Sequence, residues 1–208
     1  MLRDMPHTAS RPPGNILPNI PIVMARHDLE GIRELPVPEG YRIRTFRPGD
    51  ETVWARVETA AGEFGEEARA LEHFTKEFGP HVDEMRERCL FLEAGDGGVV
   101  GTTTAWRNPD FQGGAWGRIH WVAVVPEHQG KGLGRLLVTE ALLRMRSWHG
   151  RAYLTTQTSS WIAVHLYLTL GFAPFLTAPA EEAGWELLRR EVPHPLLGPP
   201  PYAGPPGA

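Results

Sequence analysis

The sequence predicts a single α/β domain, of the α+β kind, in which helices flank a mixed and mostly antiparallel sheet of six or seven strands. Short apolar segments joined by glycine-bearing turns predict an antiparallel meander over residues 89–125. A helical segment separates this meander from the next apolar segment, at 151–156, so the strands before and after that helix must run parallel. A chain of 208 residues can bury the core of one such domain and still carry tails.

Residues 41–88 predict one strand followed by helices. Cations alternate with apolar side chains from Tyr41 to Phe46, as on a half-buried strand, and Asp50 follows in position to cap a helix. The pattern beyond it predicts helices over about 51–61, 66–79 and 82–88. We expect these helices to flank the cleft of the domain.

Turn and capping residues define the elements that follow. Strands from Cys89 to Glu93 and from Gly98 to Trp106 are joined by Ala-Gly-Asp-Gly-Gly, which accepts the positive φ of a hairpin turn. The other predicted elements are a strand from Gly114 to Val125, a helix from the glycine turn at 130–134 to about Trp148, a strand over 151–156, a helix from Ser160 to Gly171, and strands over about 172–177 and 184–191.

The two ends of the chain differ in composition from the predicted domain at 39–192. Residues 1–38 are rich in proline, with one apolar patch at 20–25, and predict an arm that lies on the domain or is partly disordered. Residues 193–208 are rich in proline and glycine, which favours a flexible tail. No apolar segment resembles a signal core or reaches the ~20 residues of a membrane span, so we expect a cytoplasmic protein without a membrane partner.

Charge and cysteine content argue against several classes of protein. The 21 Lys and Arg against 25 Asp and Glu leave a net charge of -4, without the basic excess of a nucleic-acid surface. Cys89 is the single cysteine and lies in an apolar run, which is typical of a small core residue and excludes an intramolecular disulfide. No spacing of His, Cys and carboxylate residues indicates a metal site.

A glycine-rich turn after the third strand of the meander carries the strongest functional signal. Gly130, Gly132 and Gly134 open a helix whose first backbone amides point outward unpaired, and glycine has no Cβ to keep a phosphate away. The turn therefore predicts a pyrophosphate site. A Walker A loop would need Ser or Thr after Lys131, where Gly132 stands, and a dinucleotide fingerprint needs a different glycine spacing.

The spacing matches another motif, Gln-x-x-Gly-x-Gly, with Gln129 as its first residue. It follows Trp-Val-Ala-Val-Val-Pro at 121–126 and resembles the central motif of the GNAT superfamily of N-acetyltransferases. A second match, to Ala-x-x-Leu-Tyr-x-x-x-Gly-Phe, is formed by Ala163, Leu166, Tyr167, Gly171 and Phe172. The segment 41–50 is similar to the first strand and turn of the family, so the resemblance covers about 40–192.

The resemblance implies a GNAT-like sheet that is splayed between the strand ending near Val125 and the strand starting near Arg151. It also implies an acetyl-CoA-dependent N-acetyltransferase that moves an acetyl group to a primary amine of a small molecule or peptide, by direct transfer through a ternary complex and without a metal. A non-catalytic acyl-CoA-binding or regulatory domain is the alternative, and a homodimer is compatible with both. The acceptor and the length of the acyl group stay open.

In this resemblance, backbone amides of the glycine turn hold the coenzyme A pyrophosphate. The pantetheine arm lies like an extra strand against residues 122–124, and the amide near Val122 is the candidate oxyanion donor. Many family members have Asn at the position of Ser160, so the contact of this residue stays open. The coenzyme-binding candidates are Val122, Ala123, Val124, Gln129, Gly130, Lys131, Gly132, Leu133, Gly134, Arg135, Ser160 and Ala163.

Tyr167 holds the position of the family's general acid. Helical spacing places Ser160, Ala163 and Tyr167 on one face, with the small alanine leaving room beside the phenol. A tyrosine pKa near 10 lies above a thiol pKa near 8.5, so the phenol keeps its proton and can donate it to a departing thiolate.

His120 is the candidate general base, because a neutral imidazole can accept the proton that an alkylamine must lose. It stands at the strand position where the aralkylamine members of the family carry a histidine. Strand alternation predicts that His120 shares a face with Val122 and Val124, opposite Ile119, Trp121 and Ala123. Glu63, Glu66 or a relaying water are the alternatives.

Overall fold

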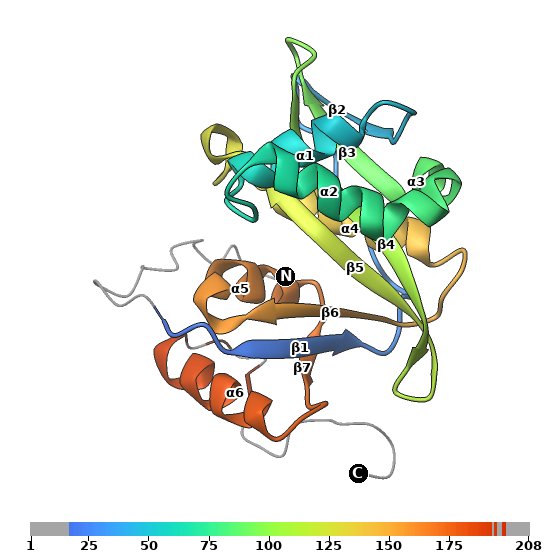
Figure 1. The fold of residues 1–208 in the computed structure, drawn as a ribbon. Helices are drawn as coiled ribbons and strands as arrows, with labels where there is room; N and C mark the ends of the chain where they lie inside the picture. Colours follow the sequence, from blue (N-terminus) through green and yellow to red (C-terminus); the bar gives the residue numbers. More distant parts are fainter. Residues whose placement is uncertain (1–16, 193, 195–196, 199–208) are drawn as a thin grey trace.

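The computed structural model describes residues 17–192, 194 and 197–198 of the chain. Its strands form one seven-stranded mixed sheet in the order β2-β3-β4-β5-β6-β1-β7 (Figure 1). The strands are β1 (Pro21–Arg26), β2 (Tyr41–Thr45), β3 (Cys89–Ala94), β4 (Val99–Phe111), β5 (Gly114–Val124), β6 (Ala152–Gln157) and β7 (Ala173–Phe175). The predicted fold class, a mixed sheet flanked by helices, is confirmed.

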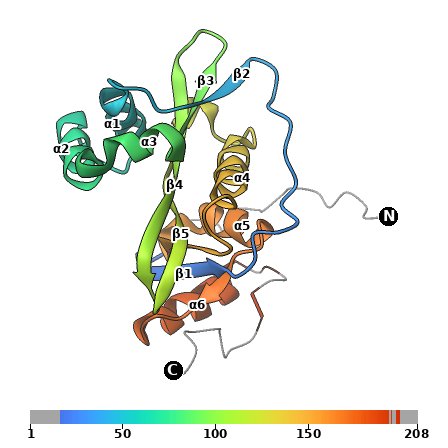
Figure 2. The same cartoon turned by 90° about the vertical axis from the view of Figure 1, so that its right-hand side faces the viewer.

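Helices cover both faces of this sheet. Figure 2 shows α1, α2 and α3 on one side of β4 and β5, and α4 on the other. One apolar cluster joins the sheet to α4, α5 and α6, and a second joins it to the first three helices. The helices are α1 (Glu51–Ala60), α2 (Glu67–Phe78), α3 (Val82–Arg88), α4 (Leu133–Met145), α5 (Trp161–Thr169) and α6 (Ala180–Glu191), with short 3-10 turns at Gly79–His81, Pro126–His128 and Thr158–Ser160.

The sheet opens between β5 and β6, as the resemblance implies. The two strands run parallel but pair only at Gly117 with Ala152 and at Arg118 with Tyr153. Beyond these pairs the strands diverge (Figure 1). The edge of β5 from residue 119 to 124 therefore has no strand partner on the β6 side within the described part of the chain.

The segment Pro21–Arg26 differs from the arm that its composition suggests. It forms β1, which pairs antiparallel with both β6 and β7. Its side chains from Ile22 to Ala25 are buried, alternately in two apolar clusters, because elements far along the chain cover both faces. A continuous apolar run is typical of such an inner strand, and proline is tolerated at its first residue. Residues 1–16 of the arm predicted at 1–38 lie outside the described residues.

The strand predicted at 184–191 is wrong, because this segment belongs to α6. Its buried residues recur at helical spacing, with Gly184 and Trp185 followed by Leu188 on the face toward the core. The close contact of Gly184 with Ile22 brings this helix against β1. Most of the predicted tail at 193–208 lies outside the described residues.

Candidate active site

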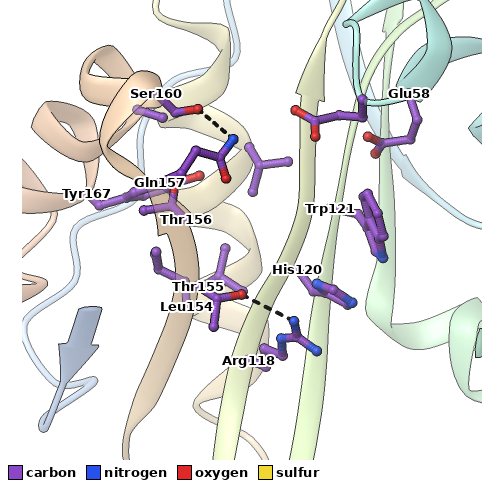
Figure 3. Close-up of a pocket in the computed structure, with 14 residues that line it drawn as sticks. Glu58, Arg118, His120, Trp121, Leu154, Thr155, Thr156, Gln157, Ser160 and Tyr167 are labelled. Carbon is purple, nitrogen blue, oxygen red and sulfur yellow. Dashed lines mark hydrogen bonds between the residues drawn. The ribbon is translucent and has the colours of Figure 1, made fainter. Parts of the chain in front are cut away.

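A cavity of about 290 Å³ lies where β5 and β6 separate. Figure 3 shows its two walls, with Glu58, His120 and Trp121 on one side and Thr156, Gln157, Ser160 and Tyr167 on the other. The catalytic candidates Tyr167 and His120 therefore meet at one pocket, together with Val122, Ser160 and Ala163 of the coenzyme set. The lining residues are Glu58, Glu63, Arg118, Ile119, His120, Trp121, Val122, Leu154, Thr155, Thr156, Gln157, Ser160, Ala163 and Tyr167.

A β-bulge in β5 sets the direction of the side chains at the pocket. Trp121 has a φ of 52°, and the register with β4 shifts between Thr102, opposite Ala123, and Thr104, opposite His120. Because of this extra residue, His120 and Trp121 both face α1 and α2, where their rings contact Phe78 and Trp54.

The predicted alternation along β5 is therefore wrong at His120. Val122 and Val124 pack against the apolar cluster of α4, on the face opposite His120. Ala123 belongs to the cluster of α1 and α2, on the same side as Trp121. A strict period of two cannot anticipate a non-glycine residue in the left-handed region.

His120 is held by a carboxylate from α2. Its Nε2 lies 2.7 Å from Oε1 of Glu77, and the imidazole is 11% exposed. Burial lowers the pKa of His120, partly offset by the hydrogen bond to Glu77, so the ring is neutral near pH 7. A neutral ring that donates from Nε2 to a carboxylate carries its acceptor lone pair on Nδ1.

Glu77 is the centre of a small network that fixes this wall of the pocket. Its Oε2 accepts hydrogen bonds from Nε1 of Trp121 at 2.8 Å and from Nε2 of His73 at 3.0 Å. Burial would raise the pKa of Glu77, but the hydrogen bonds led by His120 outweigh it and lower the pKa to about 2. The carboxylate is therefore charged across the neutral range, and it orients both His120 and Trp121.

Tyr167 reaches the pocket from α5 on the opposite wall (Figure 3). The residue is only 7% exposed, and desolvation, followed by the nearby Glu63 and Glu58, raises the pKa of the phenol well above its ordinary value. The hydroxyl is therefore protonated at all physiological pH values and can act as a donor. Its role as the general acid stays a prediction.

Ser160 and Ala163 lie in the same wall as Tyr167. The Oγ of Ser160 accepts a hydrogen bond from Nε2 of Gln157 at 3.0 Å, which ties the end of β6 to the start of α5. Ala163 lines the pocket without filling it, as its small side chain predicts.

The glycine turn forms an open cradle at the start of α4. Gly130 and Gly132 have φ values of 74° and 77°, and no atom lies within 4 Å of a Cβ built on either residue. No side chain of the described residues caps the helix that begins at Leu133, so its first amides stay available for an anion. The side chain of Leu133 is in the core, so this residue offers only its amide.

Neighbouring side chains fix the turn against β5. Nε2 of Gln129 donates to the carbonyl of Val124 at 2.8 Å, at the end of the open edge of β5. Nζ of Lys131 donates to the carbonyl of Glu127 at 3.1 Å, while Arg135 is exposed beside the turn. The contact from Gln129 holds the glycine turn against the end of the free edge of β5.

Glu58 is a pocket residue that the sequence reasoning missed. It is fully buried, and neither carboxyl oxygen has a hydrogen-bond partner within the described residues. Desolvation, and next the charge of Glu63, raise the pKa of Glu58 well above its ordinary value. The sequence could have indicated this position, because Glu58 follows Trp54 and Ala55 at helical spacing and so falls on the buried face of α1.

Two of the predicted alternative bases differ in position. Glu63 lines the pocket, and although it is exposed, partial desolvation raises its pKa. Glu66 does not line this pocket and lies 3.5 Å from Arg69 in an exposed ion pair. The carboxylates of the pocket are therefore Glu58 and Glu63.

Three further observations concern metal ligands, the cysteine and the helices. Among residues 17–192, 194 and 197–198, no group of three or more His, Cys, Asp or Glu side chains is placed to hold a metal. Burial raises the pKa of Cys89 to about 12, as in a core thiol. None of the described helices has the length and apolarity that a membrane crossing requires.

Comparison with known proteins adds three findings. Residues 53–172 match the acetyltransferase (GNAT) family. The chain is 36% identical to a mycothiol acetyltransferase of Thermomonospora curvata, over 68% of this chain and 47% of that one, and 28% identical to a mycothiol acetyltransferase of Catenulispora acidiphila, over 75% and 55%. A crystal structure of a GCN5-related N-acetyltransferase from Sphaerobacter thermophilus superposes with a TM-score of 0.60 at 25% identity, over 75% of this chain and 48% of that one. The chain thus spans about half the length of the curated relatives it matches.

Proposed function

This chain belongs to the GNAT family of acetyltransferases, and from that premise we propose that it transfers the acetyl group of acetyl-CoA to a primary amine. The proposed acceptor is a small molecule or a peptide, and transfer is direct, within a ternary complex. The observation that carries the proposal is the uncapped glycine turn at the start of α4, next to the unpaired edge of β5, whose Val122 lines the same pocket as Tyr167.

The residues of the turn fit a coenzyme A pyrophosphate. Gly130 and Gly132 adopt left-handed conformations that leave their amides open, and the space that a Cβ would occupy is empty. The free edge of β5 at residues 122–124 offers main-chain groups to a pantetheine amide chain, as a strand edge does for a peptide. Acetyl-CoA supplies the thioester whose acyl group is transferred.

Two side chains on opposite walls would move the protons of this reaction. The amine nitrogen forms the new bond to the acetyl carbon and loses a proton, which His120 accepts at Nδ1 because Glu77 occupies Nε2. The bond from the acetyl carbon to sulfur breaks, and Tyr167 donates its proton to the departing thiolate. The amide of Val122 remains the candidate donor to the carbonyl oxygen while it carries charge.

The relatives support acetyl transfer as the reaction. Two of them are named mycothiol acetyltransferases, and a similar solved structure is named a GCN5-related N-acetyltransferase. Because the overlap covers only about half of those relatives, their acceptor is not assigned to this chain.

A thiol-release screen tests the proposal. Acetyl-CoA would be offered with polyamines, aminoglycosides, amino acids, aralkylamines and peptide N-termini, and we expect amine-dependent release of free thiol with at least one class. Coenzyme A affinity would be measured in parallel. Tight coenzyme binding with no thiol release from any class would contradict catalysis and favour a non-catalytic acyl-CoA-binding domain.

A further inference from the structure

We propose that Glu58 and Glu63 form an ammonium-binding subsite in the pocket, so that the acceptor is a cationic alkylamine. This inference rests on the proposed function and names the class of amine that the same site takes. It makes Glu58 and Glu63 binding residues for the acceptor, in addition to the groups that move protons.

Glu58 is the observation from which the inference starts. Glu58, on α1, lines the pocket (Figure 3), the residue has no exposed surface, and both carboxyl oxygens lack a hydrogen-bond partner in the part of the chain that the structure describes. Burying a polar group without a partner costs free energy, because the group loses its hydrogen bonds to water. A position that served only packing would be filled better by Leu or Met.

Glu63 places a second carboxyl group at the same pocket. It lies just after α1, and its backbone N–H donates to the carbonyl of Glu58 at 3.0 Å, which fixes the two residues relative to each other. Desolvation raises the pKa of both carboxyl groups, and the charge of Glu63 raises the pKa of Glu58 further, so the charged forms conflict with their surroundings. A bound cation would remove this conflict, since it favours the charged form of both groups.

The cations of the pocket do not neutralise this pair. Arg118 is the arginine that lines the cavity, and its Nη2 donates to Oγ1 of Thr155, on β6, at 3.3 Å. Within the described residues, neither Glu58 nor Glu63 forms an ion pair, unlike the buried carboxyl of Glu93, which is held by Arg42 and Arg44. Among the described residues, neither acid therefore has a cationic side chain within ion-pair distance when it ionises.

An aromatic wall lies in the same pocket and suits an alkylammonium group. The indole of Trp121 lines the cavity, stacks at 5.3 Å on the ring of Phe64 and meets Trp54 edge to face at 5.4 Å. Glu77 anchors the indole N–H, so the ring is fixed in orientation. Tryptophan faces attract ammonium groups by cation–π interaction, while the carboxylates supply the counter-charge.

The experiment measures equilibrium binding, without turnover. Phenethylamine and putrescine would each be titrated into the full chain saturated with coenzyme A, beside phenethyl alcohol and butanediol as uncharged matches, with heat or tryptophan fluorescence as the signal. The variants are Glu58→Gln and Glu63→Gln. The matched control is Glu140→Gln, since Glu140 on α4 also has a pKa raised mainly by burial but does not line the pocket.

We expect at least one amine to bind more tightly than its alcohol by tenfold or more. Glu58→Gln and Glu63→Gln should each weaken that amine at least tenfold and leave coenzyme A affinity unchanged, while Glu140→Gln stays within twofold of the parent. Should Glu58→Gln fail to fold, as judged by lost coenzyme binding, the more exposed Glu63→Gln decides the question.

Three results would overturn the subsite. They are equal binding of amine and alcohol, no binding of either amine, and unchanged amine affinity in both pocket variants. Amine binding without thiol release would contradict the proposed function but leave the subsite standing. Thiol release together with unchanged amine affinity in both pocket variants would support the proposed function but contradict the subsite.

Discussion

The imidazole of His120 donates from Nε2 to Oε1 of Glu77 over 2.7 Å, across the contact between β5 and α2. A carboxylate with a pKa of about 2 can only accept at neutral pH, so this contact fixes one tautomer of the imidazole. Burial keeps the ring neutral. In the proposed mechanism, Glu77 is therefore a positioning residue, whose effect on the reaction passes through His120.

Replacing Glu77 with Gln tests this role. We expect kcat to fall on the order of 10- to 100-fold, because the tautomer is no longer fixed and base catalysis is worth about 10²–10⁴-fold. Glu77 raises the pKa of His120, so its loss should move the acid limb of the kcat/KM profile to lower pH. His73→Gln is the control, since half-exposed His73 contacts the other oxygen of Glu77. An unshifted pH profile would refute the link.

Replacing Tyr167 with Phe tests the general acid. Turnover should fall by about 10²–10⁴-fold, while the dissociation constant of coenzyme A changes little, because the ring and its packing remain. Since desolvation holds the phenol pKa far above neutrality, the alkaline limb of the wild-type profile should not report Tyr167 below pH 9. Wild-type turnover in the variant, measured by thiol release, would remove Tyr167 from the mechanism.

Replacing Gly132 with Ala tests the phosphate cradle. The left-handed φ of 77° makes any Cβ cost roughly 1–2 kcal/mol, and the methyl group would stand where the anion approaches. Gly113→Ala is matched to it, with a φ of 73° and open space, at the β4–β5 turn at the other end of β5. Both variants should lose similar stability in thermal melts, but only Gly132→Ala should weaken coenzyme A binding, by tenfold or more in a titration.

Glu58 predicts an unusual pH dependence of stability. Burial raises its folded pKa above the unfolded value, so the group favours the folded state fully below the unfolded pKa, and this advantage is lost as pH rises through the folded pKa. The variant Glu58→Gln has no ionisable group at this position, so it does not lose this stability as the pH rises. The variant should therefore melt at a higher temperature than the parent at pH 8, by about 2–4 °C for each kcal/mol gained, with the difference shrinking toward pH 4.5. A lower melting temperature at pH 8 would contradict the burial of an unpartnered carboxyl group.

Local chemistry made part of this molecule predictable from sequence. The glycine turn at 130–134 depends on the positive φ values of Gly130 and Gly132, and the hairpin turn between β3 and β4 depends in the same way on Gly97. The shared face of Ser160, Ala163 and Tyr167 follows from their spacing along a single helix. Each of these signals lies within a few residues of the feature it specifies.

The features that the sequence pattern did not predict depend on contacts between residues far apart in the chain. β1 becomes a strand because β6 and β7 pair with it from more than a hundred residues away, and α6 is helical because Trp185 and Leu188 bury together against the core. The bulge at Trp121 turned His120 toward Glu77, a contact that no local pattern encodes. The sequence pattern places Glu58 on the buried face of a helix, but only the folded structure shows that it lines the pocket.

Direct product analysis tests the central claim of amine acetylation most closely. Acetyl-CoA labelled in its acetyl group would be incubated with the full chain and the amine selected by the thiol-release screen, and the products would be separated by mass spectrometry. The account predicts labelled N-acetyl amine in amounts equal to the free coenzyme A, formed only when enzyme and amine are both present. Labelled acetate in place of the amide, or no loss of acetyl-CoA at saturating coenzyme, would contradict it.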